Sequence, residues 1–301
     1  MDEHQRTPTS FLEMYGLGRF PFDERPDGSG FILFGSQRRA FEQVVAHLTQ
    51  GSGVMTLRGD GGIGKTHLLL AAAAAVRAST PVIAVVRPAA GRVDRDTLLQ
   101  TIGGDGATPE DVIRTLLNRP RTAMVIDDVD LLTRSAQAVL SAILHQVPDR
   151  IAVAQTATVG RFDLPDGPAG REVALGRLGP AELRQYVEQR LWMAGGTTRR
   201  LISADALRLI VANGQGLPGT VNRMMEAVMT AGFARGDALI TRHTVAAALG
   251  PAAERRERES GRRRRMILPL LATLLLLVGV SAFLYRGLIE EPPPSQVTKA
   301  P

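Results

Sequence analysis

The sequence has 301 residues, of which 44% are hydrophobic and 22% are charged, so it can form more than one globular domain with a hydrophobic core. It contains no cysteine, which excludes disulfides and thiolate chemistry, and none of its five histidines falls at metal-ligand spacing. The net charge of +6 is mostly local, because residues 254–265 hold seven arginines and three glutamates. The small remaining charge does not predict a nucleic-acid-binding surface.

A glycine-rich turn lies between a predicted strand, residues 54–59, and a predicted helix, residues 65–78. Its sequence GDGGIGKT fits the phosphate-loop pattern G-x-x-x-x-G-K-[ST], in which glycines let backbone N–H groups approach phosphate oxygens. Lys65 would reach the β- and γ-phosphates of ATP, and the Thr66 hydroxyl would bind Mg²⁺. A glycine-rich turn with a coincidental lysine is the alternative. The predicted nucleotide-binding residues are Gly59, Asp60, Gly61, Gly62, Ile63, Gly64, Lys65, Thr66 and His67.

An apolar strand ending in acids follows about 60 residues later, over residues 123–130 with the sequence AMVIDDVD. This is the form of a Walker B element. Asp127 would hold Mg²⁺ through water, and Asp128 would orient the attacking water. Acids at the solvated end of a strand are the alternative, but the preceding phosphate loop favours the catalytic interpretation.

Helices and strands alternate around these two motifs. Strands are predicted at residues 81–86 and 150–157 and helices at residues 108–118 and 135–146, with Thr108 as a helix N-cap. Such alternation is typical of a parallel sheet covered on both faces. From Pro180 to residue 249 the apolar spacing is helical throughout, which predicts a small all-helical domain, here called the lid.

Residues 266–285 form a run of twenty residues without charge, long enough for a helix that crosses a bilayer. A buried core helix is the alternative, although such helices are usually shorter. The arginines before the run place the N-terminal part in the cytoplasm by the positive-inside rule. The sequence therefore predicts one transmembrane helix in a bacterial-type inner membrane, with a single-pass topology and an exported tail over residues 286–301.

The whole pattern resembles an AAA+ ATPase, and its ends resemble the general secretion pathway A (ExeA-type) family. The N-terminal resemblance rests on Gly16, Leu17, Pro21, Phe22, Pro26, Asp27, Phe31 and Ser36, and the lid resemblance on the sequences LGPAELRQYVEQRLWMAGG and ANGQGLPGTVNRM. The resemblance implies that Gln155 takes the sensor-1 position near the γ-phosphate, with a polar strand cap as the alternative. It also implies an arginine finger at Arg161 or Arg171, unless both are solvated surface charges.

The candidate catalytic residues are therefore Lys65, Asp127 and Asp128 from the two motifs, with Gln155 and Arg171 added by the resemblance, and the motifs give Thr66 with Asp127 as the metal site. Three features depart from the family pattern. Asp128 stands where the family usually has Glu, and Gly219 stands where the lid usually supplies an arginine, although Arg223 follows one helical turn later. The tail is too short for the peptidoglycan-binding domain of the secretion ATPases.

The expected fold class is α/β, a P-loop NTPase (AAA+) parallel sheet with a small C-terminal all-helical lid, followed by one transmembrane helix. The expected domains are an N-terminal segment packing on the ATPase core (1–36), the P-loop α/β nucleotide-binding domain (37–178), the helical lid (179–250), a basic linker (251–265), the transmembrane helix (266–285) and a short disordered tail (286–301).

The expected function is that of a membrane-anchored ATPase with ATP and Mg²⁺ as cofactors. It would work as a homo-oligomer and would assemble or energise an envelope complex for secretion or surface-polymer export. Two alternatives stay open. One is a nucleotide-dependent switch or adaptor with slow hydrolysis. The other is a helper ATPase of the DNA-transposition type, against which the apolar span and the small residual charge argue.

Overall fold

The computed structural model describes residues 10–23, 33–86, 91–158 and 171–250 of the chain. Within these ranges one parallel sheet has the strand order β2-β3-β4-β1-β5. The strands are β1 (Gly53–Gly59), β2 (Val82–Val86), β3 (Thr122–Ile126), β4 (Ile151–Thr158) and β5 (Arg171–Ala174). In the register, Gly59 pairs with Thr158 and Ile126 pairs with Gln155. The carboxyl ends of β1, β3 and β4 therefore meet at the same edge of the sheet.

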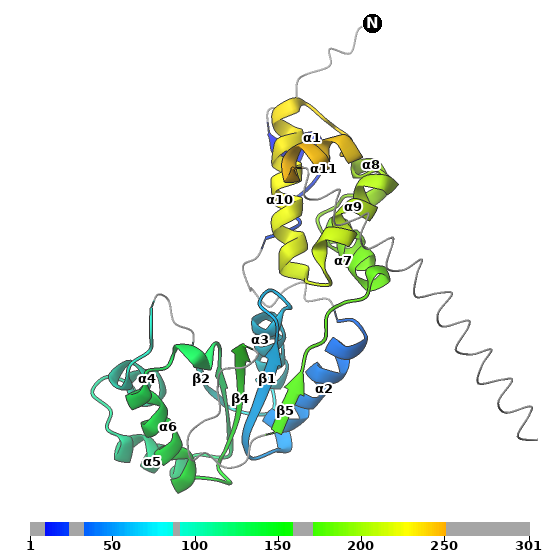
Figure 1. Cartoon of the computed structure of the whole chain (residues 1–301). Coiled ribbons are helices and arrows are strands. Elements are labelled where there is room, and N and C mark those ends of the chain that lie inside the picture. Colours follow the sequence, from blue (N-terminus) through cyan, green and yellow to red (C-terminus); the bar gives the residue numbers. More distant parts are fainter. Residues whose placement is uncertain (1–9, 24–32, 87–90, 159–170, 251–301) are drawn as a thin grey trace, which may run out of the picture. The chain divides into compact units, whose positions relative to one another are not determined.

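Helices cover both faces of this sheet (Figure 1). One face packs on α2 (Gly35–Gln50) and α3 (Lys65–Val76) around Leu57, Leu68 and Val125. The other face packs on α4 (Arg95–Gly103), α5 (Pro109–Asn118) and α6 (Arg134–Gln146) around Met124, Ile126 and Val153. Burial on both sides explains why the central strands are almost continuously apolar rather than alternating.

The start of α5 follows the prediction closely. Thr108 caps the helix by accepting a hydrogen bond from the backbone N–H of Asp111, and the Asp111 side chain accepts one from the backbone N–H of Thr108. Pro109 occupies the first helical turn, where its missing N–H leaves no bond unmade. This capping box fixes where α5 begins, and its buried residues Val112 and Leu116 pack in the same core cluster as α4 and α6.

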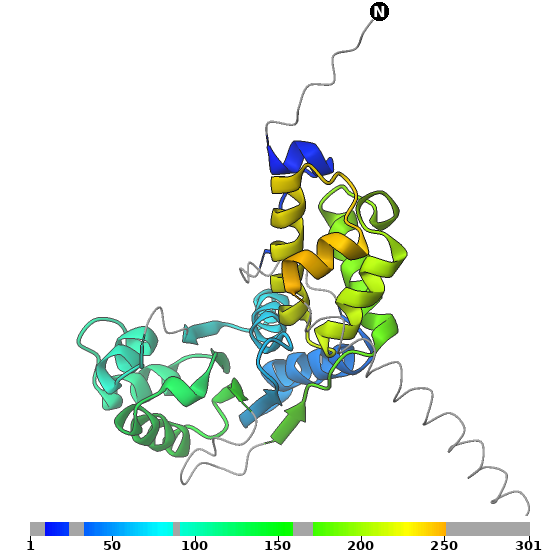
Figure 2. The same cartoon turned by 45° about the horizontal axis from the view of Figure 1, so that its top comes forward.

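The regular elements of the lid in the described residues are helices, with one isolated parallel β-bridge between Ile202 and Ile240. The helices are α7 (Pro180–Met193), α8 (Thr198–Leu201), α9 (Ala204–Gly214), α10 (Pro218–Arg235) and α11 (Arg242–Leu249). Their buried residues include Val187, Leu191, Ile210, Met225 and Met229. We expected Trp192, Met224, Met225 and Met229 to lie in the core. Met225 and Met229 are fully buried and Met224 is half-buried, but Trp192 is 74% exposed, so that part of the prediction was wrong. Figure 2 shows α10 along the lid, with α1 (Phe11–Tyr15) against one of its ends.

The N-terminal segment contacts the lid over residues 10–23, although we expected it to pack on the ATPase core. The Tyr15 hydroxyl donates a hydrogen bond to the carbonyl of Met229 on α10, at 3.0 Å. The Arg190 guanidinium on α7 donates 2.7 Å hydrogen bonds to the carbonyls of Pro21 and Asp23. These bonds connect the beginning of the chain to the lid.

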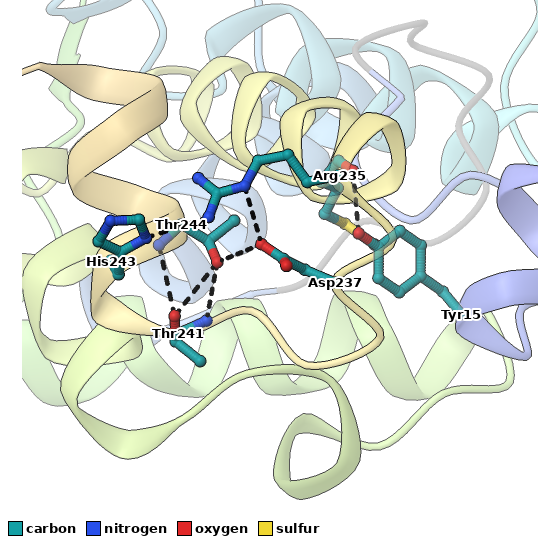
Figure 3. A network of polar contacts seen from close by, with 7 residues as sticks. Tyr15, Arg235, Asp237, Thr241, His243 and Thr244 are labelled. Carbon is teal, nitrogen blue, oxygen red and sulfur yellow. Dashed lines mark hydrogen bonds and ion pairs between the residues drawn. The ribbon is translucent and has the colours of Figure 1, made fainter.

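A polar network at the junction of α10 and α11 lies close to the hydrogen bond between Tyr15 and Met229 (Figure 3). The Asp237 carboxylate accepts a 2.9 Å hydrogen bond from the Thr244 hydroxyl and lies 3.4 Å from Nε of Arg235. A nitrogen of Arg235 lies 3.1 Å from Nδ1 of His243. Burial raises the pKa of the Tyr15 phenol to about 12, and the negative charge of Asp237 adds to the effect.

The predicted transmembrane helix requires a correction to the fold class. No helix within the described ranges is long and apolar enough to cross a membrane. The longest of them, α10, has 18 residues but carries Arg223, Glu226 and Arg235, whose charges oppose insertion into hydrocarbon. Residues 266–285, where we expected the span, lie outside the described residues. The transmembrane helix is therefore removed from the fold class, which keeps the P-loop α/β sheet and the helical lid.

Candidate nucleotide site

The predicted phosphate loop joins β1 to α3, as the sequence indicates. Gly62 and Gly64 have φ angles of +79° and +103°, a region that residues with a side chain rarely adopt. A Cβ atom on Gly59 would come within 3.1 Å of the Leu175 carbonyl, whereas one on Gly61 would meet no described atom within 4 Å. The space beside Gly61 is therefore open to a ligand, and the turn itself requires the other three glycines.

Lys65 begins α3 and is 7% exposed. Its ammonium group donates hydrogen bonds to the carbonyls of Gly59 at 2.8 Å and Asp60 at 3.2 Å, both within the loop. The loop thus satisfies the buried charge in part, and the third proton remains for a phosphate. Lys65 is also the single lysine within the described ranges, because the other lysine of the chain is Lys299.

Asp127 brings three segments of the chain together at one carboxylate oxygen. Its Oδ1 accepts a 2.9 Å hydrogen bond from the Thr66 hydroxyl of α3 and a 2.8 Å bond from the Thr156 hydroxyl of β4. The Thr156 oxygen in turn accepts a 2.7 Å bond from the backbone N–H of Asp128. Asp127 is 5% exposed and Thr156 is fully buried, so the bond between them forms away from bulk water, while the bonds from Thr66 and Asp128 are partly buried.

The donor atoms of Thr66 and Asp127 fit a magnesium ion. A hydroxyl and a carboxylate are hard oxygen ligands, which Mg²⁺ prefers. In the part of the chain that the structure describes, no group of three or more His, Asp or Glu side chains could hold a metal alone. A Mg²⁺ ion at this position would therefore take its other ligands from phosphates and water, as Mg²⁺ usually does. When bound, it would neutralise charge that develops on the transferred phosphoryl group.

Asp128 has a left-handed backbone conformation, with a φ angle of 52° and a ψ angle of 61°. Among residues with a side chain, aspartate and asparagine adopt this conformation most readily, because their short polar side chains bond to the local backbone. The conformation gives a physical reason for aspartate at this position, where the resemblance implies glutamate.

Gln155 points to the opposite face of the sheet from Thr156, because neighbouring strand residues alternate. Its side chain is 1% exposed and donates a 2.9 Å hydrogen bond to the Thr56 hydroxyl on β1. The Oε1 atom is buried without a hydrogen-bond partner. The structure therefore brings Thr156, and not Gln155, to the carboxylate of Asp127, and the sensor-1 role of Gln155 stays a prediction.

Arg171 begins β5 and is exposed. It pairs with Met55, four residues before Gly59, so it lies roughly 13 Å along the strand from the phosphate loop of its own chain. A finger acts on the site of a neighbouring subunit, and this role of Arg171 stays a prediction. The alternative finger, Arg161, lies outside the described residues.

The sequence interpretation missed three further contacts of the phosphate loop. The amide of Gln37, which is 3% exposed, donates a 3.2 Å hydrogen bond to the carbonyl of Ile63. Arg177 pairs with Asp60, and the backbone N–H of Gly219 donates to the carbonyl of Gly62. The sequence signal for Thr156 was present, since two polar residues follow each other in an apolar strand and only one can face α3. No sequence signal indicated the other contacts.

Comparison with solved structures identifies the fold to which this site belongs. No protein-family model matches the chain, and no curated protein matches it either. Solved structures do match. Domain III of the replication initiation protein DnaA from Thermotoga maritima has a TM-score of 0.53 at 13% identity, over 75% of this chain and 96% of that one. The RuvB Holliday junction branch migration motor from the same organism has a TM-score of 0.51 at 15% identity, over 71% and 67%. The Drosophila ORC bound to DNA has a TM-score of 0.55 at 15% identity, over 83% and 69%.

The chain has the AAA+ P-loop ATPase fold. At these identities the likeness shows the fold alone, and the finer resemblance to the general secretion pathway A family is not confirmed. As the sequence predicted, the glycine turn lies between β1 and α3, and Asp127 and Asp128 directly follow β3.

Proposed function

We propose that this protein binds ATP–Mg²⁺ at the phosphate loop and hydrolyses it to ADP and inorganic phosphate, with water attacking the γ-phosphate and the β–γ phosphoanhydride bond breaking. The observation that supports the proposal most is the 2.9 Å bond between the Thr66 hydroxyl and Asp127 Oδ1, which joins the loop to the end of β3. In this proposal the loop N–H groups and Lys65 bind the phosphates, Thr66 and Asp127 hold the Mg²⁺, and Asp128 orients the attacking water.

Nucleotide binding and phosphate release by the full-length protein test this function. Lys65→Ala removes a charge-assisted contact to the phosphates, so both ATP binding and turnover should fail. Arg114→Ala is a matched control, because it removes one positive charge from a side chain on α5 that is 70% exposed. A control variant that loses ATP binding as Lys65→Ala does would make the loss nonspecific and would count against the site.

We further propose that the active form is a homo-oligomer in which Arg171 completes the site of a neighbouring subunit. The experiment is a mixture of two inactive variants, Lys65→Ala and Arg171→Ala. In a mixed oligomer some interfaces combine an intact phosphate loop with an intact Arg171, so part of the turnover should return. A mixture that stays inactive would contradict a finger at Arg171.

A slow ATPase that acts as a switch is the second candidate function. The side chains at positions 128 and 219 favour it. The resemblance implies glutamate and arginine there for fast turnover, whereas this chain has aspartate and glycine. Turnover with and without added ligands separates the two candidates. The names of the matched structures make DNA one ligand to add, and an envelope complex for secretion or surface-polymer export, suggested by the N-terminal and lid motifs, is the other.

A further inference from the structure

Arg177 lies in the connection between β5 and the first lid helix, α7, and contacts the phosphate loop. Its Nε atom is 2.7 Å from Oδ2 of Asp60, the second residue of the loop. The two side chains are 51% and 41% exposed, so water reaches this ion pair. Asp60 places a carboxylate beside the backbone N–H groups that the proposed function assigns to the phosphates. The guanidinium of Arg177 neutralises that carboxylate.

The lid fixes the position of Arg177. The backbone N–H of Leu178 donates a 2.9 Å hydrogen bond to the carbonyl of Gly216, in the turn between α9 and α10. Gly216 has a φ angle of +76°, and a Cβ there would lie 2.7 Å from Cβ of Arg177. The close approach of these two chain segments leaves no room for a side chain at 216. A movement of the α9–α10 turn would therefore move Arg177.

The lid contacts the phosphate loop at a second point, two residues after Asp60. The backbone N–H of Gly219, in the first turn of α10, donates a 2.8 Å hydrogen bond to the carbonyl of Gly62. This bond is neutral and leaves the charge of the loop unchanged. The electrostatic part of the connection between lid and loop therefore depends on the pair of Arg177 and Asp60.

We propose that Arg177 is a positioning residue for nucleotide binding, which neutralises Asp60 and thereby makes the affinity for ATP depend on the docked lid. The proposal rests on the proposed function, since it assumes that the loop binds phosphates. Without Arg177 the Asp60 carboxylate repels the polyphosphate, and the repulsion grows with the number of phosphate charges. Without Asp60 the guanidinium faces the polyphosphate unpaired and attracts it.

The test is a double-mutant cycle in the full-length protein with Arg177→Gln, Asp60→Asn and both together. Binding of ATP, ADP and AMP is measured at low and at moderate salt. Arg177→Gln should weaken ATP binding roughly three- to tenfold, with a smaller effect for ADP and the smallest for AMP. Asp60→Asn should strengthen ATP binding, the double variant should return close to wild type, and salt should reduce all differences.

Arg208→Gln is the matched control, because Arg208 pairs with Asp205 on the exposed surface of α9. It should leave ATP affinity unchanged. Thermal midpoints of all variants are measured in parallel. Arg177→Gln would overturn the proposal if it bound ATP as wild type does, or if it weakened ATP and AMP equally together with a lower midpoint, since that pattern indicates a structural role. Failure of the proposed function looks different, because the wild-type protein would then bind none of the nucleotides.

Discussion

The Thr66 hydroxyl donates a 2.9 Å hydrogen bond to Oδ1 of Asp127, although the two residues are 61 positions apart. Parallel strands make this contact possible, since β1 and β3 end at the same edge of the sheet and α3 begins directly after the loop. Thr156 adds a third strand end, at 2.8 Å from the same oxygen. The side-chain oxygens proposed as Mg²⁺ ligands are thus held together by hydrogen bonds from two other segments of the chain.

Thr156→Val should lower both stability and turnover. Valine has nearly the same shape, but it leaves the partly buried backbone N–H of Asp128 without this acceptor and the buried Asp127 without one donor, at about 1–3 kcal/mol of unfolding free energy. Thr156→Ser keeps the hydroxyl and serves as the control. Urea unfolding measures the stability and phosphate release measures the turnover, and a valine variant as active as the serine variant would contradict a role for this hydroxyl.

Gln155→Met tests the sensor-1 prediction beside it. If Gln155 contacts the γ-phosphate in a working oligomer, turnover should fall while ATP affinity stays, because the residue would act after binding. In the structure Gln155 donates a hydrogen bond to Thr56 inside the sheet. If Gln155→Met lowers stability but leaves turnover per folded protein unchanged, Gln155 has no sensor-1 role.

Asp128→Asn should bind ATP and fail to hydrolyse it. Asparagine tolerates the left-handed backbone as well as aspartate does but lacks the carboxylate that orients water. Asp128→Glu keeps a carboxylate and adds reach, yet glutamate adopts this backbone conformation less readily, with a strain of roughly 1–2 kcal/mol. We therefore expect Asp128→Glu to unfold at lower temperature and to turn over more slowly than wild type. Faster turnover at unchanged stability would show that aspartate keeps the enzyme slow.

Gly219→Arg should weaken ATP binding, although the family resemblance suggests that an arginine there restores a missing contact. A Cβ at 219 would lie 2.9 Å from the Cα of Gly62, a distance that real Cβ atoms do not show. Gly219→Ala should have a smaller effect in the same direction, even though alanine favours the helix by about 1 kcal/mol. Thr220→Ala, one residue further along α10, is the control. Tighter ATP binding by the arginine variant would mean that the lid can move away and use the new side chain.

Tyr15→Phe should remove a pH dependence as well as a hydrogen bond. The pKa of Tyr15 rises from 10.0 to about 12 in the fold, chiefly through burial, so the fold disfavours the phenolate. The stabilisation by Tyr15 is complete below pH 10 and is lost as the pH rises through about 12. Unfolding free energy should therefore fall more steeply for wild type than for Tyr15→Phe above pH 10. Parallel curves would contradict the burial of a neutral phenol against α10 (Figure 3).

Local patterns were enough to predict the elements that carry the nucleotide site. Each of three features could be recognised from ten residues of sequence or fewer. They are the glycine loop, the apolar strand before Asp127 and the helix cap at Thr108. The helix α4 was missed, although Asp94 caps it by accepting a hydrogen bond from the backbone N–H of Thr97. The helix has nine residues and buries only Leu98, Leu99 and Ile102, so its apolar pattern covers a single helical turn and was too short to detect.

Contacts between distant segments could not be predicted in the same way. Nothing near Gly219 in the sequence indicates that its backbone reaches Gly62, and nothing near Tyr15 indicates α10 as its partner. The choice between Gln155 and Thr156 depended on which face of β4 each side chain occupies, and the sequence alone did not fix that register. The transmembrane helix was wrong as part of the fold class, because no helix in the described part of the chain is long and apolar enough to cross a membrane, and residues 266–285 lie outside that part.

Binding of ATP–Mg²⁺ to the full-length protein tests the central claim most directly. An acyl-phosphate derivative of ATP transfers its acyl group to a nearby lysine, and Lys65 is the single lysine in the described residues. Competition by ATP in the presence of Mg²⁺ then reports occupancy of the loop. The account predicts labelling at Lys65 that millimolar ATP–Mg²⁺ abolishes and that Lys65→Ala eliminates. Absence of ATP binding by the wild-type protein at millimolar concentration would contradict it, because every site assignment depends on the phosphate loop.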